Sequence, residues 1–502
     1  MNITSVLSKI FTPRLKELDR FGMYGEEIQK EQLRKLVAAA RNTEFGREHH
    51  FSEIRSYADF CDRVPVTDYD GIKHSVERMI RGEKNILWPS DVHYFAKSSG
   101  TTNDKSKFLP VSRESLKHCH YRGGTDCVSV YFRMNPDSRF FSGKGLILGG
   151  SRAVNPFGSD AYCGDLSAIL IQNVSPFVNL FRTPDKKIAL MGEWESKLDA
   201  LAEKTISQNI TSLSGVPSWF LGLIKHILEK TGKETLTELW PDLEVFFHGG
   251  ISFAPYREQY QKLIPSPRMH YVETYNASEG FFAVQDDLSD PGMLLLIDLG
   301  IFFEFIPMDE VDNDNARPVP IWEVQAGKNY ALVITTNSGL WRYRIGDTVR
   351  VTSTDPVKIV ISGRTKHYIN AFGEELMVDN AEQAIAKTTA ETGATVLNYT
   401  AAPVYMRGNE RGRHQWLIEF GVRPQSIDDF ALLLDKNLQS LNSDYEAKRY
   451  KGLFLDPLEI IPAREGVFDQ WLRDRDKLGG QHKIPRLSNN REFIDALLQI
   501  NH

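Results

Sequence analysis

The chain has 502 residues, of which 41% are hydrophobic and 25% charged, and its formal net charge is −6. A chain of this length exceeds one ordinary hydrophobic core, so we expect two or more domains. The acidic balance argues against a nucleic-acid partner, and no run reaches the roughly 18 apolar residues of a membrane helix.

The cysteines favour a reducing compartment. Cys61, Cys119, Cys127 and Cys163 form no C-x-x-C pair and no zinc-type spacing with histidine. A disulfide framework is not expected at this low density. The N-terminal residues are mildly amphipathic but lack the continuous apolar segment of a signal peptide. We therefore expect a soluble cytoplasmic protein without a membrane partner.

The first two thirds of the chain change from one strand pattern to another. After an amphipathic helix over residues 26–40, predicted strands alternate with helices, which indicates a parallel sheet. These strands are 210–215, 243–247 and 269–275, and the helices are 220–228 and 256–263. From residue 294 the strands have short connections, which favours antiparallel pairing. They are 294–297, 301–306, 330–335 and 340–343.

A second domain is predicted after residue 364. The chain restarts with a helix over 379–389, strands over 395–400 and 415–421, and a helix over 427–442, followed by a final strand and helix. This pattern is typical of a compact α+β unit. The predicted class is α/β: a large domain over 1–364, with mixed and parallel sheets and a β-rich, barrel-like part, and a small domain over 365–502.

A hydroxyl-rich segment, Lys97–Ser112, reads KSSGTTNDKSKFLPVS and follows a short predicted strand at 92–95. Backbone N–H groups around glycine, together with Ser and Thr hydroxyls, can form an anion-binding nest. The segment lacks the G-x-x-x-x-G-K-[ST] pattern of a Walker loop. On composition alone, a solvated Ser/Thr turn is the simpler explanation.

Four further segments carry chemical potential, and each has an ordinary explanation as well. YNASEG at 275–280 follows a predicted strand, where ligands of open α/β sheets bind, but it also fits a plain polar loop. GLWRYRIGD at 339–347 contains a candidate ribose acceptor, or is a charged hairpin edge. The segment 362–376 fits a domain linker, and QHKIPR at 481–486 fits an exposed basic turn.

The order and spacing of these segments resemble the acyl-adenylate-forming superfamily. Within it, SSGTT with a following lysine, YNASEG, WRYRIGD and QHKIPR resemble the auxin-responsive Gretchen Hagen family of acyl-acid amido synthetases. The resemblance covers nearly the whole chain. It implies the acyl-adenylate-forming fold with a mobile small domain, and it implies ATP and Mg²⁺.

The resemblance also implies site residues. Those expected at ATP are Ser98, Ser99, Gly100, Thr101, Thr102, Lys107, Gly249, Gly250, Tyr275, Asn276, Ser278, Glu279, Asp347, Arg364 and Lys483. Tyr275 would lie against adenine, Asp347 would bind the ribose and Glu279 would hold Mg²⁺. Lys483 and Glu279 are the expected catalytic residues, and Arg364 and Lys366 would lie at the hinge. The loop departs from the family pattern at Asp104, where the family usually has glycine. An acid beside a triphosphate is unfavourable unless it points outward or meets a cation.

The implied activity is ATP-dependent amide formation. A small carboxylic acid would be activated as acyl-AMP and transferred to an amine, expected to be an amino acid. Candidate acyl-pocket residues are His120, Trp219 and Phe220, although the last two also fit an ordinary core. The rivals are an acyl-CoA ligase, which uses a thiol acceptor, and a non-catalytic nucleotide-binding or scaffold protein.

Overall fold

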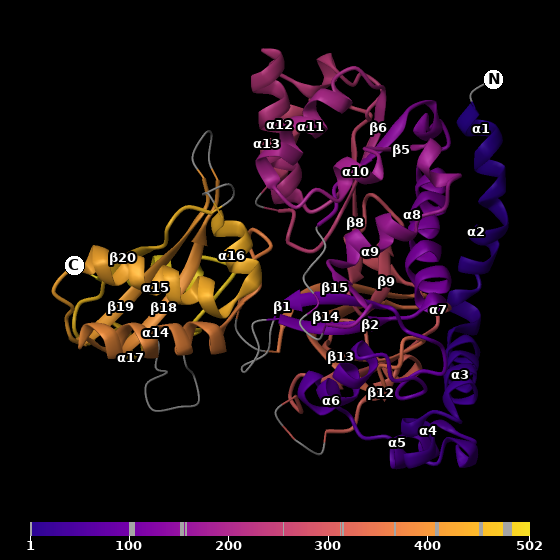
Figure 1. The fold of residues 1–502 in the computed structure, drawn as a ribbon, viewed down its shortest axis with the longest axis horizontal. Helices are drawn as coiled ribbons and strands as arrows, with labels where there is room; N and C mark the ends of the chain where they lie inside the picture. The colour runs from indigo at the N-terminus through magenta and orange to yellow at the C-terminus, as the bar shows by residue number, and fades with distance from the viewer. Residues whose placement is uncertain are drawn as a thin grey trace. The chain divides into compact units, whose positions relative to one another are not determined.

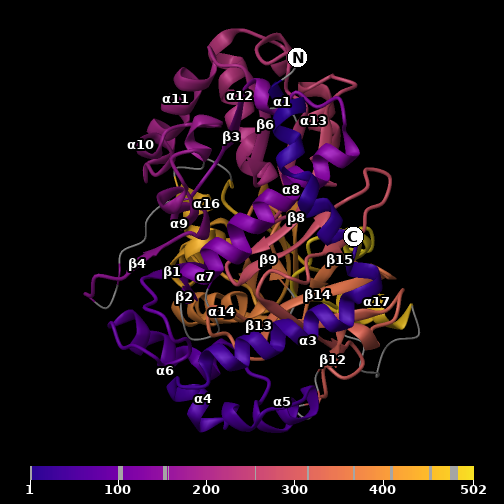
Figure 2. The same ribbon diagram turned by 90° about the vertical axis from the view of Figure 1, so that its right-hand side faces the viewer.

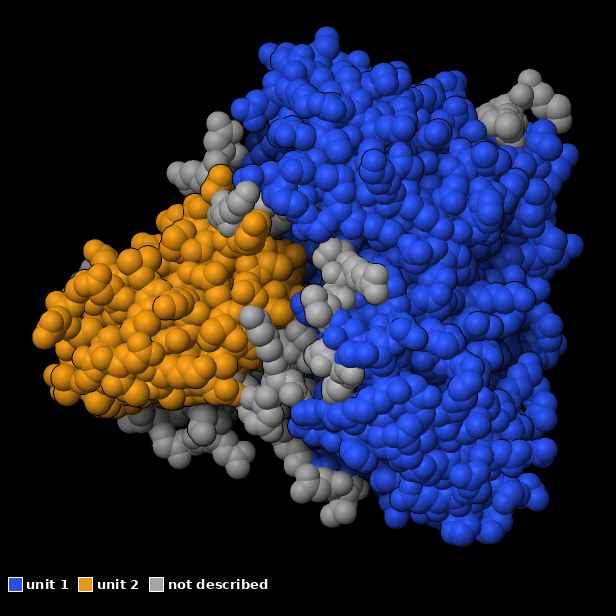
Figure 3. All heavy atoms as spheres, viewed as in Figure 1, with its two compact units in different colours: residues 1–98, 108–365 blue, residues 99–107, 366–502 orange. Residues whose placement is uncertain are grey.

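The computed structural model describes residues 3–99, 106–150, 155, 158–254, 256–311, 313, 316–365, 368–406, 411–450, 455–474 and 484–501. The chain forms two compact units (Figure 3). Unit 1 comprises Met1–Ser98 and Phe108–Thr365, and unit 2 comprises Ser99–Lys107 and Lys366–His502. None of the helices in the described ranges combines the length and apolar character needed to cross a bilayer.

One long sheet dominates unit 1, and in the described part of the chain it has twelve strands. Its parallel section runs in the order β5 (Arg182–Thr183), β3 (Lys144–Ile147), β6 (Ile210–Gly215), β7 (Val245–His248) and β8 (His270–Ala277). Beyond β8 every pairing is antiparallel, through β9 (Gly280–Gln285), β10 (Met293–Leu295), β15 (Val357–Arg364), β14 (Tyr343–Thr354), β13 (Asn329–Thr336), β11 (Ile301–Pro307) and β12 (Val319–Pro320). The predicted change from parallel to antiparallel pairing is therefore confirmed, and β8 is the strand at which it occurs.

Helices cover this sheet because their apolar stripes match it. In α12 (Pro217–Thr231), Phe220, Leu223, Ile224 and Ile227 recur at helical spacing and are all buried. The helix begins with Pro217 and ends at Gly232, whose φ of 65° suits a left-handed cap. Helix α3 (Phe21–Ala40) packs on β11. Helix α8 (Tyr121–Met134) packs on β9 (Figure 2).

The remaining elements before residue 365 are shorter. Strands β1 (Tyr94–Ser99), β2 (Ser106–Val111) and β4 (Tyr162–Gly164) form a separate sheet in the order β2-β1-β4. The helices are α1 (Ile3–Leu7), α2 (Thr12–Leu18), α4 (Glu44–Glu48), α5 (Tyr57–Arg63), α6 (Tyr69–Ile80), α7 (Arg113–Ser115), α9 (Leu166–Asn173), α10 (Lys186–Ala189), α11 (Trp194–Thr205) and α13 (Arg257–Leu263).

The predicted strand over 340–343 is wrong. Strand β14 begins only at Tyr343 and continues to Thr354. Gly339 has a φ of 88° and Arg342 a φ of 42°, so the backbone cannot be extended through this segment. The explanation of WRYRIGD as a hairpin edge also fails, because β14 lies between β13 and β15.

Unit 2 is an α+β unit, as the strand and helix pattern predicts (Figure 1). Strand β19 (Arg413–Val422) pairs antiparallel with β18 (Thr395–Val404) and parallel with β20 (Glu459–Pro462). Helices α14 (Val378–Thr392) and α15 (Ile427–Leu441) pack against each other. The other elements are β16 (Tyr368–Ile369), β17 (Leu376–Met377), α16 (Ser443–Arg449), α17 (Val467–Arg473) and α18 (Glu492–Leu498).

Candidate active site

A buried hydrogen-bond chain joins three of the predicted nucleotide residues. The Tyr275 hydroxyl donates to Asp347 Oδ2 at 2.5 Å, and Arg364 Nε lies 2.9 Å from Asp347 Oδ1. Asp347 and Arg364 are also register partners in β14 and β15. Burial, and then the adjacent Asp347 carboxylate, raise the pKa of Tyr275 well above its usual value, so its hydroxyl stays protonated and donates. Both carboxylate oxygens of Asp347 are thereby held in place.

Tyr275 belongs to the large core of unit 1. Its side chain is 5% exposed, and its ring meets Phe282 edge to face with centroids 4.8 Å apart. The aromatic body is therefore fixed by packing, and the hydroxyl end is fixed by Asp347. A place against adenine stays a prediction for this residue.

Glu279 lies at a tight turn rather than in a loop beyond the strand. Strand β8 extends to Ala277, which pairs with Gly280, so Ser278 and Glu279 form the two-residue connection to β9. The Glu279 side chain is 5% exposed. Burial is the largest cause that raises the pKa of Tyr343, and the charge of Glu279 is the next largest. The two side chains are therefore close. A buried carboxylate here fits a single protein ligand for Mg²⁺, which usually takes its other ligands from phosphates and water.

His120 lies beside Asn276 of β8 and comes from the helical segment that precedes α8. It ends a π-helical turn, Leu116–His120, just before α8, and such turns are frequent at functional sites. Its Nδ1 lies 3.2 Å from Asn276 Oδ1, while Nε2 has no hydrogen-bond partner in the described part of the chain. Burial lowers the pKa of His120 to about 4, so the imidazole is neutral near pH 7. A neutral ring can offer Nε2 to a bound substrate.

Gly249 and Gly250 directly follow β7, where the backbone geometry favours glycine at both positions. A Cβ on Gly249 would come within 2.3 Å of the carbonyl oxygen of Thr274 in β8. Gly250 has a φ of 82°, which disfavours side chains. The pair allows the chain to turn closely over the neighbouring strand, next to Tyr275.

The predicted phosphate loop is only partly described. Ser98 and Ser99 lie at the end of β1, not in a loop, and Lys107 lies in β2. Gly100, Thr101, Thr102 and Asp104 lie outside the described residues, as do Lys366 and Lys483.

The two aromatic candidates for the acyl pocket differ in their surroundings. Phe220 has no exposed surface, and its ring meets Phe246 at 5.1 Å, so it is a core residue of α12. Trp219 is half-buried. Its exposed part leaves Trp219 as the better candidate of the two.

Three of the four cysteines are unsuited to act as nucleophiles. Cys119, Cys127 and Cys163 are buried, and burial raises the pKa of Cys119 to about 12. Among the same described residues, no group of three or more His, Cys, Asp or Glu side chains could hold a metal ion.

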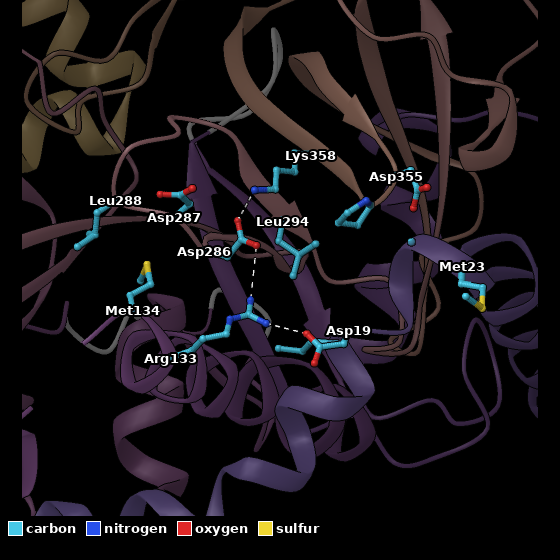
Figure 4. Close-up of a pocket in the computed structure, with 13 residues that line it drawn as sticks. Asp19, Met23, Arg133, Met134, Asp286, Asp287, Leu288, Leu294, Asp355 and Lys358 are labelled. Carbon is cyan, nitrogen blue, oxygen red and sulfur yellow. Dashed lines mark hydrogen bonds and ion pairs between the residues drawn. The ribbon is translucent and has the colours of Figure 1, made fainter. Parts of the chain in front are cut away.

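A cavity of about 920 Å³ lies near the start of β15, whereas the Tyr275–Asp347–Arg364 chain lies at the end of that strand (Figure 4). Lys358, near the start of β15, lines it, whereas Arg364 ends that strand. Arg133 and Lys358 both form ion pairs with Asp286 there. The cavity is thus separate from the Tyr275–Asp347 chain.

Family models match all three parts of the chain. They are described as the GH3 family N-terminal domain over residues 14–269, the central domain over 294–364 and the C-terminal domain over 379–492. The chain belongs to the GH3 family. The resemblance to the Gretchen Hagen family is therefore confirmed.

Curated relatives match along nearly their full length. Indole-3-acetic acid-amido synthetase GH3.3 of Arabidopsis thaliana is 23% identical, over 94% of this chain and 90% of the relative. Jasmonoyl--L-amino acid synthetase GH3.5 of Oryza sativa subsp. japonica is 22% identical, over 95% and 94%. These are enzymes that this GH3 member resembles.

Solved structures confirm the predicted fold class. The Arabidopsis acyl acid amido synthetase GH3.15, in complex with 2,4-DB, has a TM-score of 0.61 at 18% identity, covering 97% of this chain and 95% of that one. A 2-hydroxyisobutyryl-CoA ligase, with 2-HIB-AMP and CoA, has a TM-score of 0.59 at 14% identity, covering 95% and 91%. At these identities the likeness concerns the fold.

Proposed function

We propose that this GH3 member is an ATP-dependent acyl-acid amido synthetase. It activates a small carboxylic acid as acyl-AMP with release of pyrophosphate, then transfers the acyl group to an amine, an amino acid, with release of AMP. The observation that carries the proposal is family membership over three consecutive domain models, supported by relatives that are named amido synthetases. The composition and the three buried cysteines favour a cytoplasmic location.

The reaction needs activation because a carboxylate has no good leaving group. One carboxylate oxygen attacks the α-phosphorus of ATP, and the bond to the pyrophosphate oxygen breaks. The neutral amine nitrogen then attacks the acyl carbon, the bond to the AMP oxygen breaks, and the nitrogen releases its extra proton to solvent. No side-chain nucleophile takes part, in agreement with the buried cysteines.

In this proposal, Asp347 accepts hydrogen bonds from the ribose hydroxyls. Tyr275 and Arg364 act as positioning residues, because each already holds one oxygen of its carboxylate. A preorganised acceptor loses little freedom on binding, which favours affinity. Gly249, Gly250, Asn276 and Ser278 border the same nucleotide region, and Tyr275 contributes its ring edge to it.

Phosphate binding involves segments from before and after the hinge. Ser98, Ser99, Gly100, Thr101, Thr102 and Lys107 bind the phosphates. Residues 1–364 form the binding domain, and residues 365–502 form a mobile domain that brings Lys483 to the departing pyrophosphate. Arg364 and Lys366 border the hinge.

Glu279 would hold Mg²⁺ in the turn after β8. The ion supplies positive charge that neutralises the phosphates during adenylation. The buried Glu279 carboxylate would supply the negatively charged oxygen ligand that the ion prefers. His120, with Trp219 further along, borders the acyl acid and offers it a neutral imidazole, whereas Phe220 supports Trp219 only as part of the core.

A two-dimensional substrate screen tests the proposal. Carboxylic acids are crossed with the amino acids and with coenzyme A, and mass spectrometry identifies amides or thioesters. Amides with AMP and pyrophosphate release support the proposal. Thioesters alone would identify an acyl-CoA ligase, and no acid-dependent pyrophosphate release would indicate a non-catalytic nucleotide-binding protein.

A further inference from the structure

The cavity beside Asp286 is large enough for a small ligand and takes no part in the proposed reaction. Its volume of about 920 Å³ falls within the roughly 300–1,000 Å³ that is typical of ligand pockets. The end of α2, the start of α3, the end of α8, the connection from β9 to β10 and the turn before β15 surround it (Figure 4). All of these elements belong to unit 1. The chemistry of the lining therefore indicates which ligand the cavity suits.

Carboxylates outnumber positive groups in this cavity. Two basic side chains and four aspartates line it: Arg133, Lys358, Asp19, Asp286, Asp287 and Asp355. Both bases already have acidic partners. Arg133 pairs with Asp19 at 2.8 Å and with Asp286 at 3.6 Å. Lys358 pairs with Asp286 at 2.8 Å and with Asp290, which does not line the cavity, at 3.1 Å. The uncompensated charge around the cavity is therefore negative.

Two of these aspartates have no positive partner. Within the described residues, neither Asp287 nor Asp355 forms an ion pair. Hydrogen bonds from the Ser289 hydroxyl and N–H, at 2.7 and 2.8 Å, lower the pKa of Asp287, so it is ionised at neutral pH. Asp286 Oδ1 is buried and accepts no hydrogen bond in the same part of the chain, although Lys358 Nζ lies 2.8 Å away. Carboxylates gathered around one cavity repel each other, so this arrangement favours a cationic ligand.

The unpaired aspartates stand on two sides of an apolar wall. Figure 4 shows Asp287 on one side and Asp355 on the other, with Leu294 between them. Five more apolar residues complete the wall: Leu18, Met23, Met134, Leu288 and Pro356. Met23 and Leu288 are exposed, and a methylene chain that covered them would gain from burial of apolar surface. Methionine side chains adapt readily to such a chain. The lining thus suits an elongated cation with an aliphatic middle and separated charges.

We propose that this cavity is a second ligand site and that it binds a linear aliphatic polyamine. The terminal ammonium groups of the ligand bind Asp287 and Asp355, and its methylene groups pack on Leu294. A further ammonium group, where the chain has one, meets Asp286. The inference is independent of the proposed function, because the cavity contains no residue of the Tyr275–Asp347 chain.

Calorimetric titration of the full chain tests the need for separated charges. The ligands are spermidine, butane-1,4-diamine, butylamine and Mg²⁺. We expect spermidine to bind about tenfold more tightly than butylamine, because it forms further charge pairs while both carry an aliphatic chain. Butane-1,4-diamine should lie between them. Affinity for spermidine should fall as salt is added, since the cavity is open to solvent and its charges are screened. Mg²⁺, which has no aliphatic chain, should not displace bound spermidine at equal concentration.

A double variant places the binding in this cavity. Asp287→Asn combined with Asp355→Asn removes the two unpaired charges and keeps the size of both side chains. Both residues are exposed, so we expect normal folding and spermidine binding that is about three- to tenfold weaker than in wild type. The matched control is Asp428→Asn combined with Asp429→Asn. It removes two exposed charges from the first turn of α15 in unit 2, and it should leave the affinity for spermidine unchanged.

Several results would overturn the inference. Wild type that shows no saturable binding of spermidine, or that binds butylamine equally tightly, would mean that separated charges are not recognised. Displacement of spermidine by Mg²⁺ at equal concentration would assign the cavity to a divalent metal ion. Equal affinities in wild type and the Asp287/Asp355 double variant would place the binding elsewhere. The same loss in the α15 control would indicate general attraction to a chain of net charge −6. None of these results would bear on amide synthesis.

Discussion

Tyr275 and Asp347, 72 residues apart, share a buried hydrogen bond of 2.5 Å. The hydroxyl donates to one carboxylate oxygen while Arg364 holds the other, so the acid is oriented before any nucleotide binds. This relationship connects the YNASEG segment to the WRYRIGD segment. Tyr275 therefore fixes the position of Asp347, a second residue of the proposed nucleotide site.

Tyr275→Phe should weaken ATP binding without abolishing it. A hydrogen bond to a charged group contributes about 1.5–3 kcal/mol. Because Arg364 still holds Oδ1, we expect ATP affinity to fall by about tenfold, near the low end of that range. A binding titration measures this. The control is Tyr131→Phe. It removes a hydroxyl that is hydrogen-bonded to Glu244 and His270 rather than to Asp347, and it should leave ATP affinity unchanged.

Asp347→Ala should have a larger effect on the same titration. Loss of both ribose hydrogen bonds should cost roughly 2–4 kcal/mol of ATP binding free energy, allowing for imperfect additivity. The comparison ligand is the 2′,3′-dideoxy analogue of ATP, which wild type should bind more weakly than ATP. If Asp347→Ala still discriminates between the two nucleotides as strongly as wild type, Asp347 is not the ribose acceptor.

Glu279→Gln should preserve the fold and remove adenylation. The amide keeps the size of the side chain but lacks the charge that Mg²⁺ requires of a carboxylate ligand. Acid-dependent ATP–pyrophosphate exchange is the measurement, with added Mg²⁺ as a second variable. Partial recovery at high Mg²⁺ would agree with a metal role, whereas near-normal exchange at ordinary Mg²⁺ would contradict it.

Local patterns predicted much of the fold because they are local. Apolar residues at helical spacing identified α12, and β-branched and aromatic runs identified β7 and β8. The change from parallel to antiparallel pairing followed from the lengths of the connections. The neighbour relation of β10 and β15 had no local signal, because more than sixty residues separate them.

Site geometry was harder to foresee for the same reason. The turn at Ser278 and Glu279 was missed because Tyr275, Asn276 and Ala277 look like the start of a loop but continue β8. Arg342, in the WRYRIGD segment, is buried in an ion pair with Glu304 at 2.9 Å, a partner 38 residues away that no local pattern indicates. Buried partners from distant segments decide such roles, and a sequence pattern does not reveal them.

Lys483→Ala should impair adenylation much more than aminolysis. By its resemblance to the mobile-domain lysine of the family, Lys483 contributes charge as pyrophosphate departs and contributes less to initial ATP binding. We therefore expect near-normal ATP affinity, strongly reduced pyrophosphate exchange, and nearly normal aminolysis of a synthetic acyl-adenylate. Equal losses in both half-reactions, or a collapse of ATP affinity, would assign Lys483 to static binding or to structure.

His120 should make the folded protein sensitive to acid. Burial lowers the pKa of His120 from 6.5 to about 4, so the unfolded chain takes up this proton first as the pH falls. The folded state loses stability from this group between pH 6.5 and 4, by roughly 1.4 kcal/mol per pH unit at most.

Urea unfolding at several pH values isolates this contribution. The free energy of unfolding of His120→Gln should fall less steeply than that of wild type over this interval, and the two slopes should agree above pH 7. His118→Gln is the matched control, because His118 is exposed in the same π-helical turn and should retain the wild-type slope. Parallel curves for wild type and His120→Gln would mean that the pKa of His120 is the same in the folded and unfolded protein, which would contradict the lowered pKa of this imidazole.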